Sequence, residues 1–394
     1  MNQTPPPLQT ESTKAEGEQN SFGCEQCGAN LKFTTGTDTL TCPFCGHQHV
    51  IEQSSEVVEE LDYHAYLLKQ EQKAVTQEFI GYQCDSCGAQ SQLAANEVAG
   101  LCDFCAAPVV VSKKNVRQIK PLSLLPFQIK QKEAFEAFKN WIGKLWFAPS
   151  LLKRLTRLEN KLNGVYLPFW TFDSNTYSHY SGQRGTYYYV TESYTATVDG
   201  KSVRKTREVR HTRWRPVSGS VSRFFNDVIV PANKSLNQKK LEALEPWDLQ
   251  NLKPYQDDYL SGFKAQRYQV GLASGFDHAK VQMQKKIRQL VKNDINGDEQ
   301  RIISINSQFN DLRFKHILLP VWISSFRYKN KSYQILVNAR TGEVQGERPW
   351  SWIKISSAII GLLALIGLGI VIWLAATDPN SAPALWWSQI KNMF

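Results

Sequence analysis

The sequence has no cysteine after residue 105, and it lacks the short motifs that mark several large enzyme classes. No G-x-x-x-x-G-K-[ST] occurs, so a P-loop helicase or ATPase is not supported, and G-x-S-x-G and H-E-x-x-H are absent as well. The seven histidines are scattered and have no evident nucleophile or acid partner. We therefore expect a protein that is not an enzyme.

Basic residues are scarce at the N-terminal end. Residues 1–112 hold four Lys or Arg against fifteen Asp or Glu, a net charge of −11, whereas the rest holds 42 against 21, a net charge of +21. A basic body suggests an anionic partner, such as nucleic acid or a lipid surface. Residues 1–20 are polar and lack the apolar core of a signal peptide, so we expect a disordered tail there.

Long hydrophobic runs are absent except for one near the C-terminus. Ile355 to Ala376 is a run of 22 residues without a charge. As a helix it would span about 33 Å, the thickness of a bilayer core, which predicts a single transmembrane helix. Basic residues precede this run, so the positive-inside rule predicts a cytoplasmic N-terminal side.

The cysteines that are present all fall in C-x-x-C pairs. In each half, 14 residues separate the two pairs, and each cysteine of the second set lies 60 residues after its counterpart, which indicates an internal duplication. The expected metal ligands are Cys24, Cys27, Cys42 and Cys45 in the first set and Cys84, Cys87, Cys102 and Cys105 in the second.

Two such pairs can present four thiolates tetrahedrally to Zn²⁺ and leave no open coordination position. The pattern therefore predicts two structural zinc sites of four cysteines each in small β zinc ribbons, with a rubredoxin-like iron site as the chemical alternative. The thiolates also favour a reducing compartment. Because this part of the chain is acidic, we interpret the ribbons as protein-binding or spacer modules, not as direct contacts to phosphate.

With 394 residues, of which 42% are hydrophobic, the chain is long enough for two or three packed units. We expect a multi-domain protein with two zinc ribbons, an α+β body and one C-terminal transmembrane helix. The expected order is a tail (1–20), zinc ribbon 1 (21–51), a helical linker (52–79), zinc ribbon 2 (80–112), an α+β cytoplasmic domain (115–349), the transmembrane helix (355–376) and a short tail (377–394).

Within these units, apolar spacing predicts helices over 56–73, 132–145 and 278–292. The clearest strand pair is 184–215, where Asp199-Gly200 separates two β-rich runs and predicts a hairpin. Arg207, Arg213 and Arg215 would share one of its faces. That face is either simply solvated or a contact surface for an anionic partner.

The order of several segments resembles a family of bacterial membrane proteins with two zinc ribbons. These segments include CPFCG, LDYHAYL, GVYLPFWTFD, RFFNDVIVPA, LEPWDL, DINGDEQ, LLPVWISSFRY and NARTGEVQGERP. Members of this family are often labelled as transcription-factor-IIB-type zinc-ribbon or primosomal-helicase-like proteins. The resemblance implies a cytoplasmic zinc-ribbon protein tethered to the inner membrane and associated with phage-shock PspA-type and SPFH-type or virion-core-like proteins.

Two hypotheses follow for the function. The first is a membrane-anchored adaptor or scaffold that recruits cytoplasmic proteins, with an envelope-stress type of role, and whose basic body lies near anionic membrane lipid. The alternative is a membrane-tethered nucleic-acid-binding protein that uses the hairpin arginines on phosphates.

Overall fold

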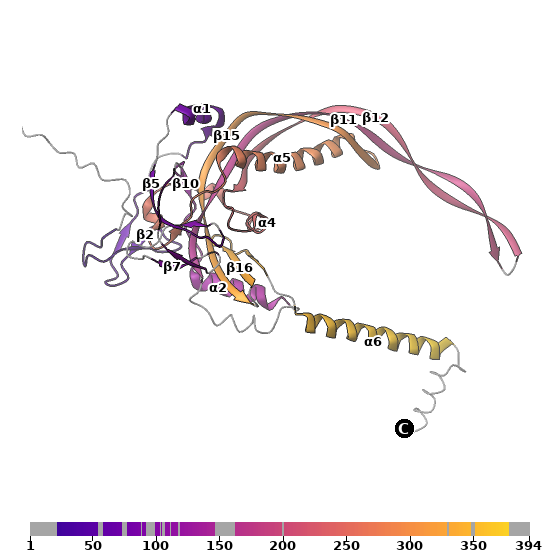
Figure 1. Ribbon diagram of the computed structural model, residues 1–394. Helices are drawn as coiled ribbons and strands as arrows, with labels where there is room; N and C mark the ends of the chain where they lie inside the picture. The colour runs from indigo at the N-terminus through magenta and orange to yellow at the C-terminus, as the bar shows by residue number, and fades with distance from the viewer. Residues whose placement is uncertain are drawn as a thin grey trace, which may run out of the picture.

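The computed structural model contains a long curved sheet with small units packed around one end and a two-stranded arm at the other (Figure 1). The structure describes residues 22–53, 58–72, 77–87, 89–91, 99–102, 104, 107–110, 112–116, 119–145, 162–198, 201–328, 331–347 and 351–377. The expected tail 1–20, all but the first residue of the expected tail 377–394, Cys105 and the Asp199-Gly200 pair lie outside these residues.

Two small units contain the cysteines. The first cysteine unit, residues 22–53, is an antiparallel sheet of β1 (Lys32–Phe33), β2 (Thr39–Thr41) and β3 (Gln48–Val50). The second cysteine unit, residues 77–116, contains β5 (Gln77–Gln83), β6 (Gln90–Ser91), β7 (Ala99–Leu101), β8 (Pro108–Val110) and β9 (Ser112–Val116). In this second unit β5 pairs with β6 and β9, and β7 pairs with β8.

The segment between the two units differs from the expected helix over 56–73. Its helix, α1 (Tyr63–Gln72), begins later, and Leu61–Asp62 forms a short strand, β4. The β4 strand pairs with Phe314 and Arg313 of the main sheet. The reason is tertiary: Tyr63 is buried in the core of the body, so the chain here is fixed to the sheet instead of forming a free helical linker.

The main sheet has nine strands and is built on three very long ones. The order along its path is β12 (Lys201–Pro231), β11 (Asn163–Val198), β15 (Glu299–Tyr328), β10 (Ser123–Leu124) and β13 (Lys253–Pro254). The remaining members are β4, β14 (Lys264–Ala265), β16 (Lys331–Asn338) and β17 (Val344–Gly346). The described body is therefore mostly β-sheet with a few helices.

The predicted hairpin is confirmed, and it is longer than the sequence indicated. Strands β11 and β12 pair from Phe169 opposite Pro231 out to Val198 opposite Lys201. The third strand, β15, ends opposite Gly185. Beyond that point the hairpin continues as two strands, which form the arm in Figure 1.

Helices cover parts of the sheet. They are α2 (Gln131–Gly143), α4 (Gln238–Glu242) and α5 (Leu272–Ile295), with two 3-10 turns, η2 (Leu249–Asn251) and η3 (Asp257–Leu260). The expected helices 132–145 and 278–292 correspond to α2 and α5, and α5 begins six residues earlier than its apolar spacing indicated. Gly275 allows α5 to approach closely, because a Cβ there would lie 2.7 Å from the ring of Trp170.

The base of the sheet has a separate core on each face. Even-numbered residues of β11, such as Tyr166, pack with α2 and the first cysteine unit. Odd-numbered residues, such as Val165 and Leu167, pack with the second cysteine unit and the α4 region. Farther along the even face, Trp170 and Phe172 pack against α5. The two cysteine units therefore lie on opposite faces of the same strands.

The last helix is α6 (Trp352–Thr377). Within the described residues it is the one helix long and apolar enough to cross a membrane, and the candidate span, Trp352–Trp373, has a mean hydropathy of 2.6. No residue of this span is buried in the chain itself, and the helix extends away from the sheet (Figure 1).

Candidate metal centres

The first cysteine unit brings its four sulfur atoms together. The Sγ atoms of Cys24, Cys27, Cys42 and Cys45 all lie within 4.8 Å of one another. Cys24 and Cys45 are 3.5 Å apart at Sγ, and Cys27 and Cys42 are 3.4 Å apart. A tetrahedral ion with bonds of about 2.3 Å would place its sulfur ligands about 3.8 Å from each other. This cage therefore fits a tetrahedral metal ion.

Two matching turns create the cage. In the first, the N–H of Cys24 donates to the carbonyl of Ala29 and that of Gly28 to the carbonyl of Cys24, both at 2.8 Å. In the second, the N–H of Cys42 donates to His47 at 2.8 Å and that of Gly46 to Cys42 at 3.1 Å. Both glycines have positive φ, 73° and 76°, a conformation that side chains disfavour. The glycine after each pair therefore closes the turn that aims two thiols at one point.

Backbone N–H groups of the cage stabilise a thiolate at Cys42, but they do not stabilise four thiolates without a cation. The backbone N–H groups of Cys45 and Phe44 donate to the sulfur of Cys42 and, against the effect of burial, lower the pKa of Cys42 to about 6. For Cys45 the backbone N–H of His47 acts in the same direction, but burial and the neighbouring sulfurs raise its pKa to about 12. Four negative charges this close need a cation among them.

The second cysteine unit repeats this geometry. The Sγ atoms of Cys84, Cys87 and Cys102 lie within 4.8 Å of one another, and those of Cys87 and Cys102 are 3.7 Å apart. The N–H of Cys84 donates to Ala89 at 2.8 Å and that of Cys102 to Ala107 at 2.7 Å. Each of these bonds corresponds to a bond of the first unit between residues 60 positions earlier in the chain. The described part thus supplies three ligands of a second candidate metal site, and Cys105 lies outside it.

The cysteine units pack into the core of the body, and their interpretation as protein-binding or spacer modules stays a prediction. The N–H of Phe33 donates to Ser261 at 3.0 Å, and Phe33 packs edge-on against Tyr259 with ring centroids 5.3 Å apart. On the other face, the hydroxyl of Ser325 and the amide of Gln334 donate to the carbonyl of Phe104, at 2.8 and 2.5 Å. Each candidate metal site therefore fastens one face of the sheet base.

Some acidic residues of the N-terminal part form ion pairs with basic residues of the body. Asp38 of the first cysteine unit pairs with Lys253 at 2.5 Å, and Glu60, between the units, pairs with Lys315 at 3.1 Å. The acidic N-terminal part thus lies against the basic body, and the sequence alone could not show this pairing.

A second polar cluster, which the sequence analysis missed, lies where the three long strands bend. Bulges interrupt the pairing of β11 next to Asp173 on both sides, and Asp227 on β12 has a positive φ of 51°. Glu60, Asp173 and Asp227 each place a carboxylate oxygen within 4.8 Å of the others. Lys315 pairs with Glu60 and Asp227 and is itself 7% exposed. We call these four residues the bend cluster.

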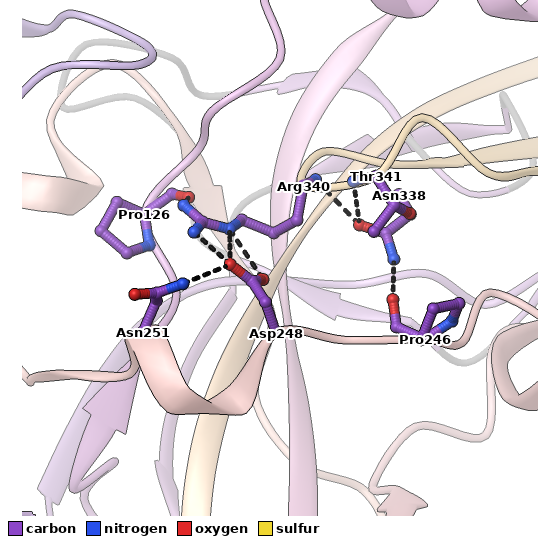
Figure 2. Close-up of polar contacts among 7 residues, drawn as sticks. All are labelled: Pro126, Pro246, Asp248, Asn251, Asn338, Arg340 and Thr341. Atoms are coloured by element: carbon purple, nitrogen blue, oxygen red, sulfur yellow. Dashed lines mark hydrogen bonds and ion pairs between the residues drawn. The ribbon is translucent and has the colours of Figure 1, made fainter.

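A further polar contact connects two of the segments on which the family resemblance depends. Figure 2 shows the guanidinium of Arg340, in NARTGEV, against the carboxylate of Asp248, in LEPWDL, with Nε 2.9 Å from Oδ1. The amide of Asn338 donates to the carbonyls of Leu244 and Pro246 at 2.9 and 3.3 Å. These segments therefore fix the turn after β16 to the loop before η2.

The predicted anionic-partner residues lie on the hairpin. Regular pairing from Arg207 opposite Glu192 to Arg215 opposite Arg184 places Arg207, Arg213 and Arg215 on one face of β12. They lie along the hairpin, apart from either candidate metal site.

Comparison with known proteins finds similarity to a chain of comparable length. A protein of Bacillus subtilis (strain 168) described as uncharacterized protein YdjG is 26% identical over 348 residues, which cover 87% of this chain and 94% of that protein. No protein-family model matches the chain. No solved structure matches it.

Proposed function

We propose that this protein is a membrane-anchored adaptor whose two zinc ribbons hold the base of a sheet while its hairpin arm is presented to a partner. The observation that carries the proposal is the position of the two cysteine units on opposite faces of the strands that extend into the arm. The apolar helix α6 follows this sheet in the chain. One end of the molecule thus supplies an anchor and the other an exposed surface.

Zinc is the metal that we propose for both cages. The four-sulfur geometry of the first cage and the matching hydrogen bonds of the second support zinc ribbons that arose by duplication. Four sulfur ligands leave no position for water or substrate, which supports a structural and non-enzymatic role. Iron is the chemical alternative for the same ligands.

The proposed location is the bacterial inner membrane, crossed once, with the N-terminal side in the cytoplasm. Arg340 and Lys354 precede the apolar part of α6, which the positive-inside rule favours on the cytoplasmic side. A reducing cytoplasm also preserves thiolates for the cages.

The partners that we propose are cytoplasmic proteins, of the PspA or SPFH type that the family resemblance implies, together with membrane lipid. A second candidate function, nucleic-acid binding, has one observation in its favour: Arg207, Arg213 and Arg215 share a face of the hairpin. The acidic cysteine units argue against phosphate contacts elsewhere on the N-terminal part.

Crosslinking in intact cells, followed by purification of the full chain from membranes, tests the adaptor function. We expect specific proteins to be recovered, and we expect the same proteins to leave the membrane fraction in cells whose chain ends at residue 347, before α6. Purification of a chain with Cys24→Ser and Cys84→Ser should recover none of these proteins. Recovery of nucleic acid alone, or partners whose membrane association is unchanged by the truncation, would contradict the proposal.

A further inference from the structure

The main sheet loses its cover at a defined point. Helix α5 follows the even-numbered face of β11 and ends at Ile295, whose carbonyl accepts a hydrogen bond from Nε of Arg184. The turn that follows leads into β15, which begins opposite Gly185. Beyond Gly185 the sheet consists of β11 and β12 only. We call residues 186–198 and 201–213 the arm.

One face of the arm continues the face that α5 covers. Alternation along the strands is unbroken from Tyr180, which packs under α5, to the tip of β11, and the partners on β12 follow in register. We call this continuation the arm face. It consists of Thr186, Tyr188, Val190, Glu192, Tyr194, Ala196 and Val198 on β11 and of Lys201, Val203, Lys205, Arg207, Val209, His211 and Arg213 on β12.

The arm face is apolar along much of its length and yet exposed. Tyr188, Val190, Tyr194 and Val203 are each 40–41% exposed. A two-stranded hairpin by itself is at best marginally stable in water, and the rest of this face is buried by a helix. The face therefore lacks the cover that its continuation has under α5.

The net charge of the arm face is positive. Its basic side chains are Lys201, Lys205, Arg207 and Arg213, and its one acidic side chain is Glu192, which pairs with Arg207 at 3.2 Å. The guanidinium of Arg213 lies 5.2 Å from the ring centre of Tyr188, and that of Arg207 lies 5.6 Å from that of Tyr194. These rings hold the two guanidinium groups on the surface, where their donors can meet carboxylates.

We propose that the arm face binds an amphipathic helix of a partner protein, with the apolar side of the helix on Val190, Val203 and the tyrosines and acidic side chains against Arg207 and Arg213. The inference rests on the proposed adaptor function and assigns the class of its partner. Two observations support it: the same sheet face binds a helix at its base, and its charge calls for acidic groups.

The length of the arm fits such a helix. The thirteen arm residues of β11 extend about 43 Å, and a helix of the 24 residues of α5 extends about 36 Å. A single-stranded nucleic acid would need open aromatic rings for base stacking, but guanidinium groups lie over Tyr188 and Tyr194. The geometry therefore favours carboxylates on a helix over bases and phosphates.

The test uses the full chain in nanodiscs of zwitterionic lipid and a fluorescent 24-residue peptide with leucines along one helical side and glutamates beside them. Arg207→Ala with Arg213→Ala should weaken binding about tenfold or more. The matched control is Arg204→Ala with Arg210→Ala, which removes the same charge from the opposite face and should weaken binding less than about threefold. A peptide of the same composition in shuffled order should bind no better than to empty nanodiscs.

Exchanging the charges of the arm and the peptide distinguishes the loss of a direct contact from a folding defect. Arg207→Glu with Arg213→Glu should abolish binding of the acidic peptide and restore binding of a version with lysine in place of glutamate. The inference would be overturned if the two alanine pairs had equal effects or if the lysine peptide did not restore binding. It would also be overturned if a single-stranded oligonucleotide or phosphatidylglycerol vesicles displaced the labelled peptide better than unlabelled peptide does. If recruitment by crosslinking persists while this test fails, the adaptor function stands and only the assigned class of partner is lost.

Discussion

The ammonium group of Lys315 lies 2.8 Å from Oδ1 of Asp227, inside the bend of the main sheet. Lys315 also reaches Glu60 at 3.1 Å, so one buried cation joins β15, β12 and the segment between the two cysteine units. Although burial acts in the opposite direction, Asp227 and Glu60 raise the pKa of Lys315, which keeps it charged at neutral pH. The bend cluster thus connects the N-terminal part to the strands that form the arm.

Removing this cation should destabilise the folded chain. Lys315→Met leaves Asp227 and Glu60 facing each other without a counter-charge, and we expect the free energy of unfolding to fall by about 3 kcal/mol. Lys280→Met, which removes an exposed i,i+3 partner of Asp277, should change it by less than about 0.5 kcal/mol. Urea unfolding followed by tryptophan fluorescence measures both. Equal effects of the two variants would show that the bend cluster does not stabilise the sheet.

Two buried groups should give the stability opposite dependences on pH. Burial raises the pKa of Asp173 from its ordinary 3.8 to about 7, so between these values the folded chain holds the extra proton and the free energy of unfolding falls as pH rises. Burial lowers the pKa of His316 from 6.5 to about 4, so between these values the unfolded chain holds the extra proton and the free energy rises. The two effects oppose each other between about pH 4 and 6.5, and the part of this range from pH 5 to 6.5 is the window for measurement.

Single substitutions should separate them. In Asp173→Asn the slope of the free energy of unfolding against pH should become more positive than in the unsubstituted chain, by up to about 1.4 kcal/mol per pH unit, because the opposing contribution of Asp173 is gone and that of His316 remains. In His316→Gln the slope should become more negative than in the unsubstituted chain. Urea midpoints at pH 5.0, 5.75 and 6.5 decide this, and slopes equal to that of the unsubstituted chain in both variants would refute it. The lowered pKa of Glu60 acts below its ordinary 4.5, outside the window.

The contact in Figure 2 gives a third prediction. Against the effect of burial, hydrogen bonds from Arg340 and Asn251 keep the pKa of Asp248 below its ordinary value. Arg340→Lys loses the planar fork that meets both carboxylate oxygens, so we expect a loss of about 1–2 kcal/mol in the free energy of unfolding. Lys139→Arg, at an exposed i,i+3 pair with Glu136, is the control and should be neutral. A neutral Arg340→Lys would contradict the proposed fixing role.

The cages give a fourth prediction. Purified full chain should carry two metal ions, and Cys24→Ser with Cys42→Ser should carry one, because that change removes two of the four sulfurs of one cage. A change of the half-buried His47 and the exposed His49 to Ala should leave two ions, since the cage is complete without them. Elemental analysis of each protein provides the count. Loss of metal from the histidine variant would show that the ligand set is different.

The local features of this fold could be predicted from the sequence. The spacing of Cys24 and Cys27, the apolar run of α6 and the β-rich runs around Asp199-Gly200 each report on residues close in the chain. The structure bears out the first cage, a helix able to cross a membrane and the hairpin. Such features need no knowledge of distant contacts.

The long-range features could not be predicted. Glu60, Asp173, Asp227 and Lys315 are far apart in the chain, and nothing in their neighbourhoods shows that strand bulges bring them together. Likewise, Phe33 and Phe104 look like ordinary residues of small metal units, whereas the sheet buries them on opposite faces. The late start of α1 has the same origin, because pairing of Leu61 with Phe314 takes precedence over helical spacing.

The most direct test of the account is hydrogen exchange of the full chain in nanodiscs, with and without a metal chelator. If the cages fasten both faces of the sheet base, chelation should speed amide exchange about tenfold or more in residues 163–169 and 317–323 and leave the arm residues 186–198 unchanged. Unchanged exchange at the base after the metal has been removed would contradict the claim that these two centres hold the sheet.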